Sequence, residues 1–307
     1  MSKLDKIEEL QNLLREDSQN SQARRQLAVL LVDCGFNDEA LKNLLYLSKN
    51  FEEDSGVFYN LGIVYEKLKQ FTQARDAYQK AIELEPEAYD AIYNLGLVYI
   101  ELKEYDFAIE CFKKVIKSDE NDSNAYFNLG LAYFKKGDLP SAIEFFQKTT
   151  DLNDEDIYAH FYIGNILKEL GDSIGARLEF QKVLDISPDY SWAYYNLGVL
   201  DYEEGDDESA LENLRQTISL NPSDLDAYKI LSKITAKNGD FEEAKNIIEN
   251  AIEQCGENGD LYYYLAKISL NLDDRENYKN YMNLALKNSS SLSISIVQAQ
   301  QELNNFE

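Results

Sequence analysis

The feature that most constrains this sequence is a 34-residue period that keeps its register along most of the chain. Windows that start at Ser55 continue forward to Gly259 and backward to Ser21, so eight windows fill residues 21–292 without an insertion or deletion. Self-similarity at such a period is the signature of repeat architectures, in which each unit packs against its neighbours. We therefore expect the 307 residues to form one stack of repeats rather than two ordinary globular domains.

Four places in each window carry the packing pattern of two helices. The seventh place is Leu or Ile in every window and the eighth is Gly, Ala or Ser, so a large side chain stands beside a small one. The small residue lets a neighbouring helix approach closely, and this packing has to offset the ~1 kcal/mol that a glycine inside a helix costs relative to alanine. The twentieth place is alanine in every window but the last, and the twenty-fourth is large and apolar, as in Ala74 and Tyr78. We expect this face of the second helix to close against the first.

The segment between the two helices has its own recurring residues. One place is glycine in five windows, and an aspartate follows four of these glycines, at Asp138, Asp172, Asp206 and Asp240. Glycine supports the left-handed conformation that ends a helix, and aspartate can cap the start of the next one. Asp240 also has the spacing of a capping box with Glu243.

The residues at these places resemble the tetratricopeptide-repeat family. In the window 55–88 the matching residues are Leu61, Gly62, Tyr65, Ala74, Tyr78, Ala81 and Pro86. The resemblance implies an all-α fold, a right-handed α-solenoid of antiparallel helix pairs. The last two windows depart from the pattern, because they lack the glycine at the eighth place and the aromatic residue at the eleventh.

The predicted organisation is a stack of eight repeats between two helical caps, because a repeat array has to cover the apolar face at each end. Residues 1–20 are expected to form the N-terminal capping helix, and residues 293–307 the C-terminal capping helix and tail. The predicted repeats are 21–54, 55–88, 89–122, 123–156, 157–190, 191–224, 225–258 and 259–292.

Composition and charge disfavour several classes of function. The formal net charge is −26, whereas nucleic-acid binding depends on Lys and Arg that neutralise phosphates, so we expect no nucleic-acid partner. No stretch approaches 18 apolar residues, and the first residues do not resemble a signal peptide, which predicts a cytoplasmic protein with no membrane partner. Cys34, Cys111 and Cys255 are far apart and form no CxxC pair, so we expect reduced thiols and no zinc site.

The sequence carries no motif of catalysis. It has no phosphate-binding Gly-rich loop, no HExxH and no GxSxG, and repeat geometry accounts for its glycines. The single histidine, His160, stands at a place that is mostly Tyr or Phe in the other windows, which favours a role in core packing. We therefore expect a protein that is not an enzyme and has neither a cofactor nor a metal site.

The resemblance implies that the first helix of each repeat lines a concave face and that its second, fifth, sixth, ninth, twelfth and thirteenth places point toward a ligand. The sixth place carries a ladder of asparagines, Asn60, Asn94, Asn128 and Asn196. Tyr162 interrupts the ladder, and Asn165 lies three residues later on nearly the same face. A carboxamide donates and accepts, so the ladder can pair with the backbone of an extended peptide, as similar ladders do in superhelical members of the family. The alternative is that each asparagine bonds only to a neighbouring helix or to water.

Aromatic residues stand beside the asparagines at the fifth place. This place is aromatic in six windows, and the spacing fits either core packing or contact with a ligand; the residues are Tyr59, Tyr93, Phe127, Phe161, Tyr195 and Tyr263. Trp192, at a second place near the rim, is a candidate anchor because partly exposed tryptophan is enriched among binding hot spots. Its alternative role is packing against the adjacent repeat.

A stripe of lysines breaks the acidic pattern near the end of the chain. Lys229, Lys233 and Lys237 follow one another at i, i+4 and i+8 on one helix face, and Lys267 continues the stripe in the next window. In so acidic a chain the stripe predicts a site for an anionic group, such as an acidic peptide segment or a C-terminal carboxylate. The alternative is that these lysines pair with the protein's own Glu and Asp.

Together these patterns predict a protein-interaction module that binds an extended peptide segment of a partner protein in its groove. We expect a monomer, with an oligomer left open. The alternative function is a self-assembling structural scaffold or assembly factor that uses its end caps or its convex face.

Overall fold

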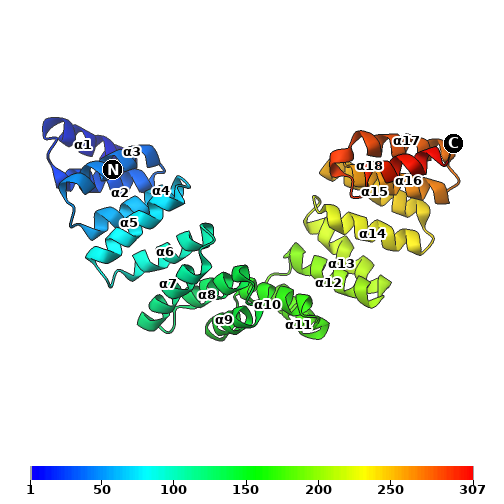
Figure 1. Ribbon diagram of the computed structural model, residues 1–307, viewed down its shortest axis with the longest axis horizontal. Coiled ribbons are helices and arrows are strands. Elements are labelled where there is room, and N and C mark those ends of the chain that lie inside the picture. Colours follow the sequence, from blue (N-terminus) through cyan, green and yellow to red (C-terminus); the bar gives the residue numbers. More distant parts are fainter. Residues whose placement is uncertain (1, 307) are drawn as a thin grey trace. The chain divides into compact units, whose positions relative to one another are not determined.

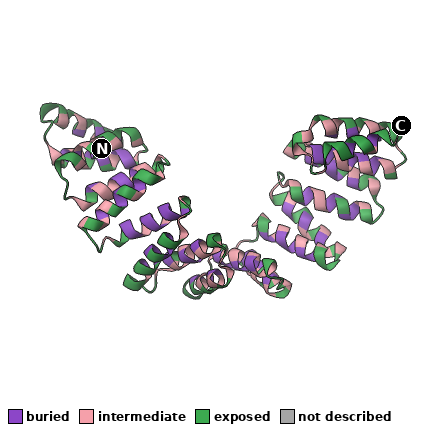
Figure 2. Ribbon diagram, in the orientation of Figure 1, coloured by how far each residue is buried: buried purple, intermediate pink, exposed green. Residues whose placement is uncertain are grey.

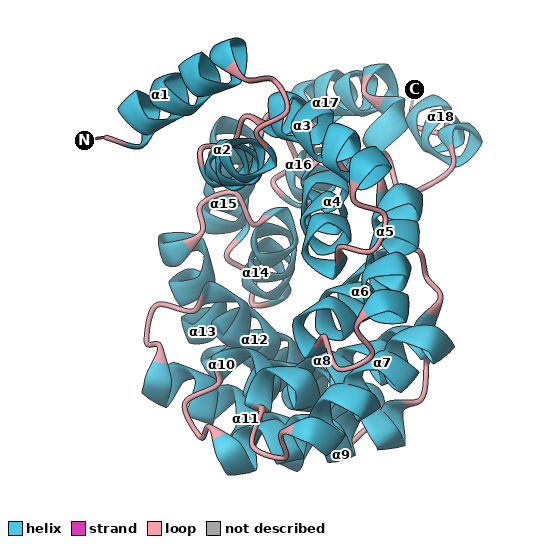
Figure 3. Ribbon diagram, turned by 90° about the vertical axis from the view of Figure 1, so that its left-hand side faces the viewer, coloured by secondary structure: helices cyan, strands magenta, loops and turns pink. Residues whose placement is uncertain are grey.

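The computed structural model describes residues 2–306, which form eighteen α-helices and one 3-10 helix and contain no strand (Figures 1 and 3). The predicted caps begin at residue 1 and end at residue 307, and these two residues lie outside the described part of the chain. The predicted all-α, helical-repeat fold class is confirmed. The chain divides into two compact units, and the division falls between Ala159 and His160, within one helix.

The first unit contains nine complete helices and the start of a tenth. They are α1 (Lys3–Glu16), α2 (Ser21–Asp33), α3 (Asn37–Asn50), α4 (Ser55–Lys67), α5 (Phe71–Leu84), α6 (Tyr89–Glu101), α7 (Tyr105–Ser118), α8 (Ser123–Lys136), α9 (Leu139–Leu152) and α10 (Ile157–Glu169).

The second unit takes the rest of α10 and the helices that follow. They are α11 (Ser173–Ile186), α12 (Ser191–Glu204), α13 (Asp207–Leu220), α14 (Leu225–Lys237), α15 (Phe241–Cys255), α16 (Gly259–Asn271), α17 (Arg275–Lys287), η1 (Ser289–Ser291) and α18 (Ile296–Asn304). From α2 to α17 the helices fall two to a predicted window, which leaves α1 and α18 outside the windows.

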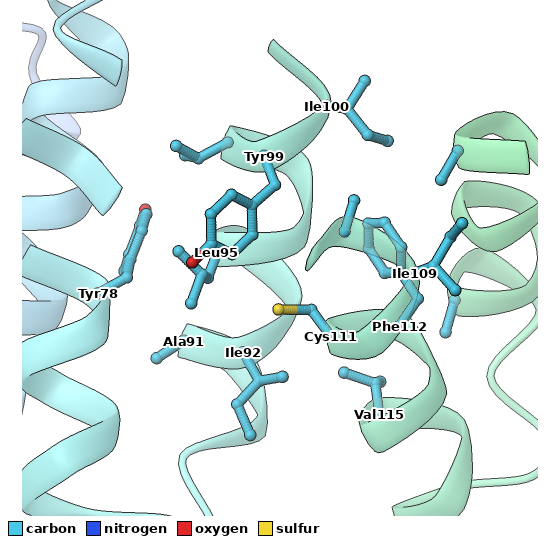
Figure 4. Packing of buried hydrophobic residues seen from close by; sticks show 14 of the residues in the cluster. Tyr78, Ala91, Ile92, Leu95, Tyr99, Ile100, Ile109, Cys111, Phe112 and Val115 are labelled. Carbon is cyan, nitrogen blue, oxygen red and sulfur yellow. The ribbon is translucent and has the colours of Figure 1, made fainter. Parts of the chain in front are cut away.

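The core of each unit lies between the two helices of a pair and between neighbouring pairs. Buried residues face the adjoining helices, and exposed residues lie on the sides turned away from them (Figure 2). Figure 4 shows this for α6 and α7, where Cys111 and Phe112 of α7 pack with Leu95 and Tyr99 of α6 in one apolar cluster. Burial raises the pKa of the Cys111 thiol to about 11, so this cysteine is an unreactive part of the core.

The eighth and twenty-fourth places fit one another in size. A Cβ atom built on Gly96 would lie 2.7 Å from Cζ of Phe112, and one on Gly62 would lie 2.4 Å from the Tyr78 ring. In each window where the twenty-fourth place is aromatic, the eighth place is glycine. Where the twenty-fourth place is Leu44, Ile248 or Met282, the eighth is Ala28, Ser232 or Ala266. The glycines at four of these eighth places therefore leave the space that the rings occupy, and a fifth, Gly198, faces the aliphatic Leu214.

The turn between the helices of a pair has one backbone conformation throughout. The predicted glycines have positive φ, from 81° at Gly35 to 91° at Gly239, and the windows without glycine place Lys69, Lys103 and Asp273 there at 57–61°. The prediction of a left-handed residue at this place is confirmed.

The predicted aspartate caps are confirmed in three of the four turns. Asp138, Asp172 and Asp206 each accept a hydrogen bond from the backbone N–H three residues later. The prediction for Asp240 was wrong, because its side chain caps nothing and no capping box forms with Glu243. The other three turns have Ser or Gly at the position of Glu243, whereas a second carboxylate so close to Asp240 is opposed by like-charge repulsion.

His160 is a buried core residue. It is 6% exposed, and its Nδ1 lies 2.6 Å from Oε2 of Glu179 on α11, a carboxylate that also accepts a hydrogen bond from Lys182. An ionised carboxylate only accepts, so Nδ1–H of His160 is the donor. Burial alone would raise the pKa of Glu179, but the hydrogen bonds from His160 and Lys182 outweigh it and hold the pKa below its ordinary value of 4.5.

This pair makes stability depend on pH in a defined direction. Because the folded pKa of Glu179 is lowered, its contribution is present above about pH 4.5 and is lost as the pH falls through the folded pKa. We expect His160→Phe to lower the free energy of unfolding by about 1.5 kcal/mol at neutral pH, where a hydrogen bond to a charged group is lost. Urea unfolding at about pH 6 and about pH 3 should show this difference shrinking in acid. An equal difference at both pH values would contradict it.

Another buried carboxylate marks the second unit. Asp201 stands at the eleventh place, where the windows of the first unit from Ser55 on have Tyr65, Tyr99 and Tyr133. It is 2% exposed and accepts hydrogen bonds from Nη1 of Arg177 at 2.5 Å and Nδ2 of Asn213 at 2.7 Å. The charge is therefore buried with two partners that satisfy both of its oxygens.

Two further properties bear on the sequence predictions. Cys34, Cys111 and Cys255 are free thiols. Among the helices of residues 2–306, none is long and apolar enough to cross a membrane.

Candidate functional site

In the first unit the ladder asparagines lie on the first helices α4, α6 and α8, and all are half-buried. The amide nitrogens are held by the protein itself. Nδ2 of Asn60 donates to O of Gly56, and Nδ2 of Asn94 lies 3.4 Å from the Tyr59 hydroxyl. Nδ2 of Asn128 donates to the Tyr93 hydroxyl at 2.8 Å and to the backbone of its own helix.

These contacts set the direction of the amide groups. When the amide nitrogen of an asparagine donates to a group within the protein, the two lone pairs of the amide oxygen can still accept a hydrogen bond from another donor. Within residues 2–306, Oδ1 of Asn60, Asn94 and Asn128 has no hydrogen-bond donor and is not buried. The first unit thus presents three carbonyl-type acceptors at the same place of successive first helices.

The aromatic residues of the fifth place have one side in the core. Tyr59 packs against Tyr78 with ring centroids 6.0 Å apart, and Tyr93 lies 5.7 Å from Phe112 in an edge-on arrangement. Phe127 lies 5.4 Å from Phe146, with the two rings tilted by 56°. All three fifth-place rings are half-buried, so they pack on the core and keep an accessible side. Burial raises the pKa of the Tyr59 and Tyr93 hydroxyls, which stay neutral partners of the asparagines.

A cavity of ≈ 370 Å³ opens beside the ladder at the N-terminal ends of α4 and α6. Its lining includes Gly56, Tyr59, Glu87, Tyr89 and Asp90. Neither Glu87 nor Asp90 has an ion-pair partner in the described part of the chain, so the cavity combines two aromatic rings with unpaired carboxylates.

The second unit places its predicted residues differently. Phe161, Asn165 and Tyr195 are half-buried. Asn196, however, is only 4% exposed, and both ends of its amide are bonded: Nδ2 donates to O of Trp192 at 2.8 Å, and Oδ1 accepts from Lys168. Asn196 differs from the ladder asparagines of the first unit because Lys168, on α10, donates to its amide oxygen.

The Trp192 side chain is 54% exposed on the first turn of α12. The alternative in which it packs against the adjacent repeat would require a more buried ring. Trp192 therefore remains an accessible anchor candidate.

Most of the lysine stripe is paired with carboxylates of the protein. Lys229 lies 3.4 Å from both Asp226 and Asp260. Lys237 is 2.6 Å from Asp207, and Lys267 is 2.8 Å from Glu302. Lys233 differs, because it lies 5.3 Å from the Tyr202 ring centroid and a hydrogen bond to that tyrosine raises its pKa. The alternative of pairing within the protein thus holds for Lys229, Lys237 and Lys267. Lys233 contacts the Tyr202 ring instead of a carboxylate.

The C-terminal helix carries a contact that sequence reasoning missed. In α18 the buried residues are Ala299 and Leu303, and Oε1 and Oε2 of Glu302 lie 3.3 and 3.1 Å from the Tyr263 hydroxyl. Ala299 and Leu303 have the four-residue spacing of the third and seventh places, so the register shifts by four residues after residue 292. The shift gives Glu302 the sixth place, where it contacts the preceding fifth-place tyrosine as Asn94 and Asn128 do.

No group of three or more His, Cys, Asp or Glu side chains within residues 2–306 is arranged to hold a metal ion. The accessible features of the candidate site are amide oxygens, half-exposed rings and Lys233, which contacts a tyrosine ring rather than a carboxylate.

Comparisons with protein families agree with this geometry. Models described as tetratricopeptide repeat match residues 56–87 and 123–156, residues 77–110 and residues 193–224. A model described as TPR repeat matches residues 98–137. No curated protein matches the chain. The matches confirm the family resemblance that the recurring residues indicated.

Solved structures with a similar fold include structures of MamA and YrrB with identity above one quarter. MamA from residue 41 to its end, from Desulfovibrio magneticus RS-1, is 27% identical, with a TM-score of 0.54 over 56% of this chain and 97% of that one. YrrB, described as a TPR protein with an unusual peptide-binding site, is 26% identical, with a TM-score of 0.51 over 61% and 96%. A tetratricopeptide repeat protein from Parabacteroides merdae ATCC 43184 is 17% identical with a TM-score of 0.58 over 82% and 98%, a likeness of fold alone.

Proposed function

This chain carries tetratricopeptide repeats, the fold of a protein-interaction module, and we propose that it binds an extended peptide segment of a partner protein along its first helices. The observation that carries the proposal is the row of amide oxygens on Asn60, Asn94 and Asn128. Each of these nitrogens makes at least one hydrogen bond inside the protein, so the oxygens are oriented before a ligand arrives. Such preorganisation lowers the entropic cost of binding.

The chemistry of this row fits a peptide backbone. Each amide oxygen can accept a backbone N–H of an extended segment, whatever the side chain beside it. The half-exposed rings of Tyr59, Tyr93 and Phe127 then supply apolar contact next to each hydrogen bond. The cavity with Glu87 and Asp90 fits a basic side chain of the segment, since carboxylates and tyrosine rings both attract a cation. YrrB, with its peptide-binding site, supports the same class of ligand.

The second unit contributes a different surface in this proposal. Trp192 and Tyr195 offer apolar contact, with Phe161 and Asn165 on the preceding first helix. Lys233 is the first candidate for an anionic group of the ligand, because Lys229, Lys237 and Lys267 would have to exchange their own carboxylates for it. Asn196 would likewise have to release Lys168.

Two sequence predictions about the setting stay predictions. They are a monomer in the cytoplasm and a partner that is a protein rather than a nucleic acid or a membrane.

The test measures binding of a peptide that the protein selects from an array of random dodecamers. We expect Asn94→Ala/Asn128→Ala to weaken binding of this peptide by about tenfold or more, because two oriented acceptors are lost. Fluorescence anisotropy of the labelled peptide gives the dissociation constant. The matched control is Gln73→Ala/Gln147→Ala, which removes two exposed amides from the second helices α5 and α9.

Tyr59→Phe/Tyr93→Phe separates binding from positioning. It frees the Asn94 and Asn128 amides from their hydroxyl partners but leaves both asparagines in place, so we expect a smaller loss of affinity than for the alanine pair. If the alanine pair folds normally and keeps the affinity of the wild type, the ladder is structural. Light scattering over a concentration series tests the scaffold alternative, which predicts assembly that the peptide does not disturb.

A further inference from the structure

A row of two exposed apolar side chains lies on α11, the second helix of the 157–190 window. Ile174 and Leu178 stand four residues apart on this helix and are 84% and 58% exposed, and Leu170, in the turn before the helix, is 55% exposed. The opposite face of α11, with Ala176 and Phe180, is buried against α12. The row is thus on the side of α11 turned away from the core of its unit.

The other windows show that this row is unusual for the repeat. At the place of Ile174 they have Asp38, Thr72, Asp106, Pro140, Glu208, Glu242 and Glu276. At the place of Leu178 they have Lys42, Asp76, Glu110, Glu144, Glu212, Asn246 and Asn280. The repeat therefore folds with charged or polar residues, or in one window with a proline, at these places, and packing does not require the two apolar residues of α11.

Three exposed glutamates lie in the following repeat, and the first of them contacts α11. Nη2 of Arg177 on α11 lies 2.9 Å from Oε2 of Glu204, which ends α12 and brings this residue beside α11. After the turn that follows Glu204, Glu208 and Glu212 stand four residues apart on α13 and form an acidic row, and both are exposed. Across residues 2–306 neither of them has an ion-pair partner.

From this pairing of rows we propose a second docking surface, made by Leu170, Ile174 and Leu178 with Glu204, Glu208 and Glu212. Its occupant is an amphipathic helix of a partner protein, with apolar residues at i, i+4 and i+8 and a parallel row of Lys or Arg. Apolar contact supplies affinity, and the acidic row fixes orientation and speeds association. The surface lies on the second helices, so it is independent of the peptide groove on the first helices.

Charge decides between this occupant and two others. A second copy of the chain would bring its own acidic row and a net charge of −26 against the first, which opposes association. An anionic membrane would be repelled by Glu204, Glu208 and Glu212 for the same reason. Only a basic partner satisfies both rows at once.

The test uses a synthetic 18-residue helical peptide with leucines at i, i+4 and i+8 and a flanking row of lysines. We expect the full chain to bind it and Ile174→Asp/Leu178→Glu to bind it about tenfold more weakly or worse by fluorescence anisotropy. Both substitutions place residues that other windows carry at the same places, so the fold is kept. Glu208→Lys/Glu212→Lys should weaken binding as much, and its effect should shrink in high salt.

The controls isolate each row. Glu242→Lys/Glu253→Lys makes the same change of charge on α15 and should leave the affinity within about twofold of the wild type. A peptide with glutamates in place of the lysines should bind at least about tenfold more weakly. Equal affinity of wild type and Ile174→Asp/Leu178→Glu would overturn the proposal. So would a dimer, or binding to phosphatidylserine vesicles, that this variant abolishes, because another occupant would then use the row.

Discussion

Replacing Gly96 by alanine is expected to lower the free energy of unfolding by about 2 kcal/mol, although alanine is the better helix former. The new Cβ would lie 2.7 Å from Cζ and 2.8 Å from Cε1 of Phe112, and 3.2 Å from Cβ of Cys111. Phe112 is fully buried, so its ring has no free space into which it can move. Overpacking of this kind costs about 1–3 kcal/mol, against which the propensity gain of alanine returns at most about 1 kcal/mol.

The size match between the two places makes this prediction specific. Phe112→Leu alone leaves a cavity, but in the double variant the alanine at residue 96 faces a smaller side chain, as Ala28 and Leu44 do in the window 21–54. Urea unfolding of the four proteins should give a favourable coupling energy of about 1 kcal/mol or more. Gly198→Ala is the graded control, since its Cβ would meet the aliphatic Leu214 at 2.9 Å and should cost less. Additive effects of Gly96→Ala and Phe112→Leu would contradict the match.

The fold was accessible from the sequence because its interactions repeat at short range. The seventh, eighth, twentieth and twenty-fourth places lie within one window, and the same contacts recur in every pair of helices. The left-handed turn could also be anticipated at its glycines. Lys69, Lys103 and Asp273 adopt it as well, although their side chains disfavour it. The repeat frame therefore overrides local preference at these three residues.

The candidate site was less accessible, because its contacts join residues of neighbouring repeats. The Asn94 and Asn128 amides bond to tyrosines 35 positions earlier, and Asn196 meets Lys168 at 28 positions. Sequence spacing shows that such residues share a face but not which long side chain reaches which. Lys168 could be noticed as a departure at its place, but its choice of Asn196 depends on the packing of α10 against α12.

One feature could have been found from the repeat frame alone. Ile174 and Leu178 stand at places where the other windows carry no large apolar residue. The places shared by all windows identify the core, whereas these two residues depart from the other windows at places that the core leaves exposed. In a repeat protein those places are informative, since each window is a control for the others.

The charged network of α11 and α12 provides the largest expected effect. Arg177→Met should lower the free energy of unfolding by about 3 kcal/mol, because it leaves the Asp201 carboxylate with Asn213 as its one partner. The Asp201 side chain is 3% exposed, so water cannot replace the guanidinium. The value lies at the lower end for a broken buried pair, since the Arg177 side chain itself is 38% exposed.

Two further variants separate the unpaired charge from the loss of an arginine. Arg215→Met on α13 removes an exposed arginine that has no ion-pair partner within residues 2–306, and its effect should stay within about 0.5 kcal/mol. Arg177→Met/Asp201→Leu removes both charges and should recover most of the lost stability in urea unfolding, because the cost comes from a carboxylate left without its partner. If the double variant is as unstable as Arg177→Met, the buried charge is not the cause. The stability would then depend on the packing of the Arg177 stem against α12, which replacing Asp201 cannot restore.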